Sequence, residues 1–265
     1  MTVKIAIIGG TGVYDPAILK DLRTVEVDTK YGKVAIKVGS YGDKEVAFLA
    51  RHGEGHTVPP HLINYRANIM ALKRLGVRHI IATAAVGSLD LKMEAGHLVV
   101  VEDFLDFTKA RATTFFDGGE AGVVHTDFTY PYCPRLRQIL VQAGEKENLT
   151  IHDKAVYVCT EGPRFETPTE IKMYQSFGGH LVGMTSVPEV LLAREAEICY
   201  ATVAMVTNYG AGISPQPLTH MEVLEAMDAN KENIKKLAMK TIELLEVDED
   251  CDCQHALADF GGFTL

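Results

Sequence analysis

The chain lacks an excess of positive charge. Its 265 residues contain 26 Lys and Arg against 35 Asp and Glu, giving a formal net charge of -9 at pH 7. Broad binding to nucleic acid or to an anionic membrane requires a basic surface. The charge balance therefore argues against both kinds of partner. It also means that an anionic substrate must be held by local hydrogen-bond donors, since no general positive field is available.

Long apolar runs are absent as well, because the longest are only as long as a strand and nothing approaches the length of a membrane span. The apolar run that follows Met1–Lys4 is Ile5–Ile8, too short for a secretory signal and without a small-residue cleavage site after it. We therefore expect a cytoplasmic protein that has no membrane partner.

The cysteines lack metal-binding spacing. No Cys-x-x-Cys motif occurs, and the spacing of His and Cys does not match a zinc site. We expect no metal site. The five cysteines are Cys133, Cys199, Cys251, Cys253 and Cys159.

Apolar, β-branched runs recur along the chain, and 47% of its residues are hydrophobic. Continuous runs of this kind are typical of strands buried on both faces of a sheet. We predict strands at Val3–Ile8, Val46–Ala50, His79–Ala82, Leu98–Val101, Ala155–Val158 and Ile198–Val206.

Helix-like segments alternate with these runs, and three of them open with proline, which suits the first helical turn. The alternation predicts an α/β fold with one domain, whose twisted central sheet is flanked by helices. Residues 1–246 form this domain and 247–265 a less ordered C-terminal tail of it. The predicted helices are Leu62–Leu75, Pro134–Glu147, Pro168–Phe177, Pro188–Ala196 and Met221–Leu245.

A glycine-rich segment, Gly9–Gly12, follows the first predicted strand. A dinucleotide fingerprint beginning at Gly10 would need glycine where the chain has Asp15, and the Gly-Lys-Ser/Thr of a phosphate-loop NTPase is absent. A turn with the hydroxyl of Thr11 can present backbone N–H groups to an anion. An ordinary tight turn explains the segment equally well.

Two further segments end strands, which is where α/β folds place ligands. In Ala50–His56, the planar fork of Arg51 suits an oxyanion and His52 adds a donor, although a charged surface loop is the alternative. In Ala82–Ser88, small residues allow a ligand to approach the backbone, or simply allow a helix to pack on the strand.

Three later segments offer groups for a heterocycle and a sugar. In Glu161–Pro168, the carboxylate of Glu166 can accept from a bound base, or cap the following helix. In Gly183–Glu189, Thr185 can donate to an anion while Met184 offers an apolar face; a strand-to-helix turn is the alternative. In Val206–Gly210, Asn208 can read a base edge, or serve as a turn residue.

Together these segments resemble the methylthioadenosine phosphorylase and purine nucleoside phosphorylase family over nearly the whole chain. The resemblance implies one α/β domain, a homotrimer or a dimer of trimers, no metal and no cofactor, with inorganic phosphate as co-substrate. It rests on Ile7–Gly12, Leu49–Gly53, Asn64–Ile69, Glu161–Phe165 and Met184–Val190.

The resemblance also implies roles for individual residues. Met184 would pack on the ribose, Asn208 with Tyr209 and Gly210 would contact the purine, and His125 would reach into a neighbouring subunit's site. Phosphate would be held by Thr11, Arg51, His52, Ala84, Ala85 and Thr185.

Four positions separate two branches of this family. Methylthioadenosine phosphorylases typically have Asp-Tyr-Asp at Asn208–Gly210, Ser at Glu166, an apolar residue at His220 and Thr at Ala84. At each position the chain is similar to the 6-oxopurine nucleoside phosphorylases. The expected reaction is phosphorolysis of inosine or guanosine to free purine and ribose 1-phosphate in purine salvage, with Asn208 and Glu166 as the catalytic residues at the base.

Three alternatives remain. A methylthioinosine or methylthioadenosine phosphorylase is the nearest, and His220 argues against the 5′-methylthio group. A non-catalytic nucleoside-binding protein and a dinucleotide-dependent oxidoreductase are less compatible with the motifs. The cysteines at positions 133, 199, 251 and 253 resemble those that cross-link some thermophilic relatives, although small buried thiols are the simpler interpretation.

Overall fold

The computed structural model of the chain describes residues 3–10, 19–53, 55–214 and 220–263. Within these residues a mixed sheet of 11 strands runs through the centre of the molecule. Its main path is β2-β3-β4-β1-β5-β10-β9-β7, while β11 pairs with β5 and β6, and β6 also pairs with β8. The strands are β1 (Ile5–Gly9), β2 (Lys20–Thr29), β3 (Gly32–Tyr41), β4 (Lys44–Ala50), β5 (His79–Ser88), β6 (Leu98–Val100), β7 (Asp103–Phe107), β8 (Ile151–His152), β9 (Val156–Thr160), β10 (Leu181–Gly183) and β11 (Cys199–Tyr209).

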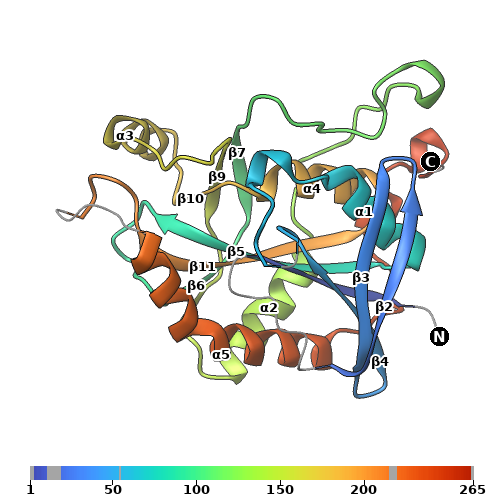
Figure 1. Cartoon of the computed structure of the whole chain (residues 1–265), viewed down its shortest axis with the longest axis horizontal. Helices are drawn as coiled ribbons and strands as arrows, with labels where there is room; N and C mark the ends of the chain where they lie inside the picture. Colours follow the sequence, from blue (N-terminus) through green and yellow to red (C-terminus); the bar gives the residue numbers. More distant parts are fainter. Residues whose placement is uncertain (1–2, 11–18, 54, 215–219, 264–265) are drawn as a thin grey trace.

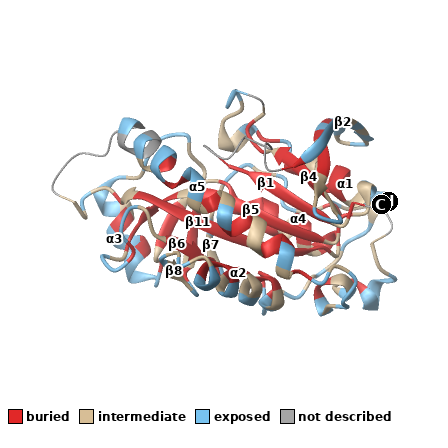
Figure 2. Cartoon of the chain, turned by 90° about the horizontal axis from the view of Figure 1, so that it is seen from below, coloured by how far each residue is buried: buried red, intermediate tan, exposed pale blue. Residues whose placement is uncertain are grey.

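Helices cover both faces of the sheet (Figure 1). One face packs against α1 and α4, and the opposite face packs against α2 and α5, which gives two main apolar clusters separated by the strands. Figure 2 shows the strands as a buried layer between helices whose outer sides are exposed. The α-helices are α1 (Tyr65–Leu75), α2 (Pro134–Lys146), α3 (Pro168–Ser176), α4 (Ser186–Glu195) and α5 (His220–Leu244), and the short 3-10 turns are η1 (Pro60–Leu62), η2 (Gly119–Ala121), η3 (Asp252–His255) and η4 (Ala258–Phe260).

Four neighbouring strands of the sheet, β4, β1, β5 and β11, are parallel to one another. Their carboxyl ends therefore meet at one edge, which is the usual position of a ligand site in an open α/β sheet. The expected α/β class, with one domain and a mixed central sheet between helices, is confirmed.

All the predicted strands and helices are present, with shifted ends, but the strands β2, β3, β7, β8 and β10 were not predicted. Every side chain of β2 is exposed or half-buried, and β3 alternates buried Val34, Ile36 and Val38 with exposed or half-buried residues. Neither strand therefore has the continuous apolar run from which the other strands were predicted. The strands β5 and β11 extend six and three residues beyond their predicted ends at Ala82 and Val206. These extensions matter because they carry residues of the candidate site.

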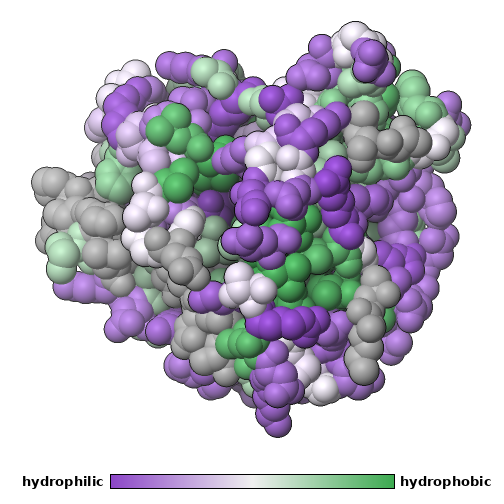
Figure 3. Space-filling model, turned by 45° about the vertical axis from the view of Figure 1, so that its right-hand side comes forward, coloured by the Kyte–Doolittle hydropathy of each residue, from purple (hydrophilic) through white to green (hydrophobic). Residues whose placement is uncertain are grey.

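The tail after Glu246 contains the turns η3 and η4 and buries Cys253 and Leu257 against the rest of the domain. The face shown in Figure 3 is mostly hydrophilic, with apolar side chains exposed in a recess. No helix in the described residues combines the length and apolar character needed to cross a membrane.

Candidate active site

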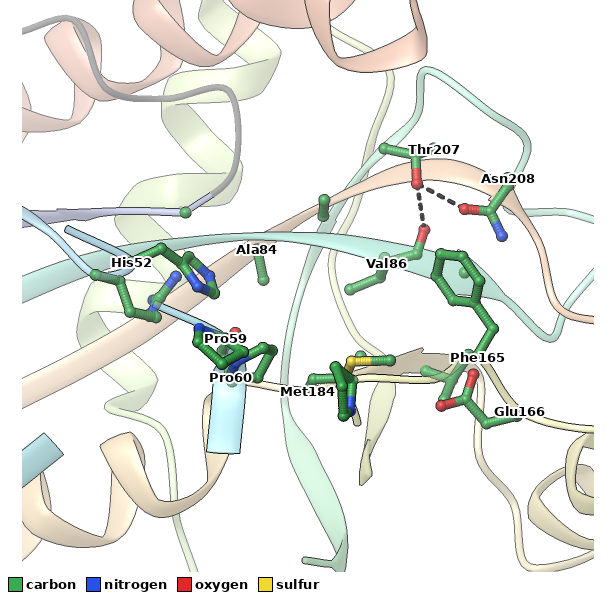
Figure 4. A pocket seen from close by; sticks show the side chains of 18 of the residues that line it. His52, Pro59, Pro60, Ala84, Val86, Phe165, Glu166, Met184, Thr207 and Asn208 are labelled. Atoms are coloured by element: carbon green, nitrogen blue, oxygen red, sulfur yellow. Dashed lines mark hydrogen bonds between the residues drawn. The ribbon is translucent and has the colours of Figure 1, made fainter. Parts of the chain in front are cut away.

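A cavity of about 380 Å³ opens at the edge where the parallel strands end (Figure 4). Side chains or backbone from all six sequence segments line it, which brings together residues as distant in the chain as Gly10 and Asn208. Such a volume fits a nucleoside-sized ligand. Figure 4 places His52 and Ala84 at one end, Phe165, Glu166 and Asn208 at the other, and Met184 between them.

Arg51, directly after β4, is fixed by a buried carboxylate. Its Nε and Nη2 donate to the two oxygens of Glu189, each at 2.7 Å, and Nη1 donates to the Thr83 carbonyl at 2.7 Å. Both side chains of the ion pair are 1% exposed. Burial alone lowers the pKa of Arg51, but the pairing with Glu189 outweighs it and raises the pKa above its usual range. The guanidinium thus stays charged, and two of its five N–H groups lie beyond these three bonds.

Tyr200 completes this buried network. Its hydroxyl donates to Glu189 Oε1 at 2.7 Å and accepts from Thr202 at 3.1 Å. Because the carboxylate is held from both sides, Arg51 has one well-defined position at the cavity wall. A pre-positioned donor of this kind loses little freedom when it binds an anion.

His52 lies next to Arg51, and its expected role as a donor needs correction. Its Nδ1 lies 2.9 Å from the Val58 carbonyl, which can only accept, so Nδ1 carries the proton. Burial, together with the charge of Arg51, lowers the pKa of His52 to about 4. The ring is therefore neutral at pH 7, and Nε2 is an acceptor, suited to a P–OH or sugar hydroxyl group.

The backbone around Gly10 and Ala84 approaches the same end of the cavity. A Cβ on Gly10 would lie 2.6 Å from the Thr83 carbonyl oxygen, so only glycine fits there. Thr185 precedes α4 and its hydroxyl does not cap the helix. The side chain of Thr185 hydrogen-bonds with the buried Tyr157 hydroxyl, which fixes its position at the cavity wall. Ala84, Ala85 and Thr185 all line the cavity.

Glu166 lies at the opposite end. Its Oε1 accepts from the Thr160 hydroxyl at 2.7 Å, and burial raises its pKa. The alternative role as a helix cap is wrong, since Thr167 caps α3 in a reciprocal capping box with Glu170. The carboxylate is thus directed to the cavity together with Phe165, a residue that is 44% exposed.

Asn208 owes its orientation to a β-bulge in β11. The pairing with β5 shifts between Val206 and Asn208, which leaves Thr207 as the extra residue. The Thr207 hydroxyl lies 2.7 Å from Asn208 Oδ1, and Asn208 Nδ2 donates to the Tyr209 carbonyl at 2.8 Å. Bulges re-aim side chains in this way beside ligand sites. One amide N–H of Asn208 lies beyond these bonds.

Met184 lies between the two ends, over Gly162. That glycine has a φ of +66°, which favours glycine, and a Cβ there would lie 2.5 Å from Met184 Sδ, so a larger residue would displace the thioether. The buried guanidinium of Arg111 fixes this turn, because it donates to the carbonyls of Met184 at 2.6 Å and Glu161 at 2.8 Å. A thioether between a base end and an anion end suits the apolar face of a sugar.

Two predicted residues do not line this cavity, and two others fall outside the description. Tyr209 lines an adjoining hollow that shares Glu166 and Asn208 with it. His125 is exposed, outside the cavity. Thr11 lies outside the described residues. His220 is the first residue of α5, and its side chain lies outside the description as well.

Sequence reasoning missed the residues that hold others in place. Glu189 stands in a motif that was recognised, but nothing in the sequence shows that it pairs with Arg51. Arg111 lies in a region of the sequence that carries no motif. No cluster of metal-binding side chains found in the described residues lies in the cavity.

The family profile described as "Phosphorylase superfamily" matches residues 4–243. The chain belongs to the phosphorylase superfamily. Among curated relatives, the "Probable 6-oxopurine nucleoside phosphorylase" of Dictyoglomus turgidum is 56% identical over 97% of this chain and 98% of its own. The "6-oxopurine nucleoside phosphorylase" of Pyrococcus furiosus is 54% identical over 96% of this chain and 97% of its own.

Solved members of the superfamily share the fold. The methylthioadenosine phosphorylase of Schistosoma mansoni in complex with adenine superimposes with a TM-score of 0.92 at 34% identity, covering 97% of this chain and 96% of its own. The same fold thus occurs in superfamily proteins named for a 6-oxopurine and for an adenine nucleoside. The choice of base must lie in individual side chains of the site.

Proposed function

We propose that this phosphorylase cleaves 6-oxopurine nucleosides, inosine and guanosine, with inorganic phosphate to give the free purine and ribose 1-phosphate, as an enzyme of purine salvage. The observation that supports the proposal most strongly is that Glu166 and Asn208 both line one end of a cavity, while Arg51 lines the other end. The relatives named above for 6-oxopurines agree with it.

The base end distinguishes the two purine classes by hydrogen-bond pattern. A 6-oxopurine has an N1–H donor and an O6 acceptor, whereas adenine has neither. The free oxygen of Glu166 accepts from N1–H, and the remaining N–H of Asn208 donates to O6 or N7. Adenine would leave buried polar groups unpaired, a mismatch that costs roughly 1–3 kcal/mol for each group.

The reaction follows from this arrangement. A phosphate oxygen attacks C1′ of the sugar as the C1′–N9 bond breaks, through a transition state with positive charge on the sugar. The bond electrons pass to the purine, where the donor N–H of Asn208 stabilises the developing negative charge. Arg51, Thr185 and the acceptor nitrogen of His52 hold the phosphate. No covalent enzyme intermediate, metal or cofactor takes part in this step.

Assembly and location belong to the same proposal. We infer a homotrimer or a dimer of trimers in the cytoplasm, with His125 extending to a neighbouring subunit's cavity. Its exposed position outside the cavity of its own chain is compatible with this role.

The test is product analysis of inosine incubated with the purified enzyme. With phosphate we expect hypoxanthine and ribose 1-phosphate in equal amounts, and without phosphate no cleavage. Arg51→Ala should mainly weaken the use of phosphate. Free ribose, formed without phosphate, would instead identify a hydrolase.

A further inference from the structure

Four of the five cysteines meet at one point of the fold, far from one another in sequence. Cys133 caps the start of α2, Cys199 opens β11, and Cys251 and Cys253 lie at the turn η3 of the tail. Their four Sγ atoms all lie within 4.8 Å of one another. Three of these side chains are buried, and Cys251 is half-buried.

The arrangement fits a tetrahedral metal site. Around a zinc ion with Zn–S bonds of about 2.3 Å, neighbouring sulfurs lie roughly 3.8 Å apart. The Sγ atoms of Cys133 and Cys251 lie 3.7 Å apart. Because all four sulfurs lie within 4.8 Å of one another, they form a single cluster compact enough to surround one ion.

The groups around the sulfurs favour thiolates. Cys133 Sγ accepts from the backbone N–H of Leu136 at 3.4 Å, at the positive end of the α2 dipole. Cys199 Sγ accepts from Gln254 Nε2 at 3.6 Å, and Arg78 holds that amide by donating to its oxygen. Donors of this kind support the ligands of structural metal sites.

We propose that Cys133, Cys199, Cys251 and Cys253 bind one zinc ion as a tetrathiolate that fastens the C-terminal tail to the sheet. The four thiols release their protons to solvent as four Zn–S bonds form, and neither sulfur nor zinc changes oxidation state. This site departs from the expectation of no metal, because its ligands come from three separate parts of the chain and match no local spacing.

The site is structural, and it is separate from the proposed chemistry. Cys199 and Asn208 lie near opposite ends of β11, nine residue steps apart, which corresponds to roughly 30 Å along a strand. Removal of the ion therefore acts first on the stability of the fold and the anchoring of the tail. Because the two sites are separate, a protein without phosphorylase activity can still bind zinc, and a protein without zinc can still be active. The two proposals can therefore fail independently.

The test is elemental analysis of the purified full-length protein in reducing buffer, after dialysis against zinc chloride and removal of excess metal. We expect about one zinc per chain. Replacement by Co²⁺ should give the thiolate-to-cobalt charge transfer and strong visible bands of a tetrahedral tetrathiolate. Cys253→Ser should lower the zinc content about tenfold and reduce the melting temperature.

Cys159→Ala is the matched control, because Cys159 is buried but stands outside the cluster. It should keep the zinc. Mass spectrometry of the unreduced, alkylated protein covers the remaining outcomes. Disulfides among the four cysteines, or five alkylated thiols in a protein that takes up no zinc, would overturn the proposal. If Cys253→Ser fails to fold, the zinc stoichiometry and cobalt spectrum of the wild-type protein still decide.

Discussion

At the proposed phosphate end of the cavity, Arg51 is held by two hydrogen bonds to its buried partner Glu189 and a third to the Thr83 carbonyl. At the proposed base end, Glu166 and Asn208 are oriented by the hydroxyls of Thr160 and Thr207. The first arrangement couples the site to the core, since Glu189 and Tyr200 are buried deep behind it. The second consists of side chains at strand and loop ends, which change without disturbing the core.

This difference explains how one fold serves several nucleosides. Phosphate is common to the proposed reactions, and Arg51, the residue proposed to bind it, is anchored to buried side chains of the folded domain. The base differs among superfamily members, and the side chains that read it lie where substitution costs little stability.

The largest effect should come from Glu189→Ala, which leaves the buried charge of Arg51 without its partner. Removing one partner of such a pair costs about 3–5 kcal/mol of folding stability. The KM for phosphate should also rise, because Arg51 loses its fixed position. Urea unfolding and phosphate kinetics measure the two effects, and Glu189→Gln, which keeps one acceptor, should be milder. An unchanged free energy of unfolding in Glu189→Ala would show that the Arg51 end of the cavity is not coupled to the core more strongly than the Glu166 end.

Asn208→Asp should alter the choice of base while leaving the fold intact. A carboxylate accepts from the 6-amino group of adenine and cannot donate to O6 or N7 of a 6-oxopurine. The ratio of kcat/KM for inosine to that for adenosine should fall by about a hundredfold, or about 3 kcal/mol. Asn148→Asp, in a turn that does not line the cavity, should leave the ratio unchanged. A large loss of thermal stability in Asn208→Asp would contradict the claim that side chains at this end of the cavity change without disturbing the core.

His220→Val should change selectivity at the 5′ position of the sugar. An imidazole nitrogen hydrogen-bonds a 5′-hydroxyl, whereas a methylthio group prefers an apolar wall. Losing the bond costs roughly 1–3 kcal/mol, or about one to two decades in specificity for inosine over methylthioinosine. Kinetics with both substrates test this. An unchanged ratio would place His220 outside the sugar site and favour methylthioinosine as the substrate.

Glu166→Gln should have the smallest effect at neutral pH, about 1 kcal/mol on kcat/KM for inosine, because the amide oxygen still accepts from N1–H. Burial raises the pKa of Glu166 above its ordinary 4.5. Wild-type activity should therefore fall as the pH drops through this raised pKa, since a protonated carboxyl no longer accepts, and the variant should lack this fall. A pH profile of kcat/KM for both proteins measures it.

The same substitution should not lower stability at pH 7. A raised native pKa means that Glu166 favours the folded state only at low pH, and that this contribution is lost as the pH rises through the native pKa. The neutral amide avoids the cost of a buried charge. A lower melting temperature for Glu166→Gln at pH 7 would show that the carboxylate has a structural role.

The fold was largely predictable from apolar periodicity. Strands buried on both faces, such as β1 and β11, appear as continuous apolar runs, and helices such as α2 and α3 open with proline. The antiparallel pair β2 and β3 has no continuous apolar run and was not predicted in this way. β3 instead alternates buried Val34, Ile36 and Val38 with exposed or half-buried residues, a period-two pattern that a search for continuous apolar runs does not detect.

The site was predictable as a set of strand-end motifs but not as a geometry. Nothing in the sequence indicates that Glu189 pairs with Arg51. Nor does it indicate that a β-bulge at Thr207 orients Asn208, or that His52 Nδ1 donates to the Val58 carbonyl. Each depends on contacts between segments brought together only by folding. The cysteine cluster was hidden for the same reason, since no local spacing joins Cys133 and Cys199 to the tail.

The most direct test of the account is the wild-type selectivity, measured as kcat/KM with phosphate for inosine, guanosine, adenosine and methylthioadenosine in one series. The pairing of Glu166 with Asn208 predicts that inosine and guanosine exceed the two adenine nucleosides by at least about a hundredfold. A preference for adenosine or methylthioadenosine would contradict the proposed function.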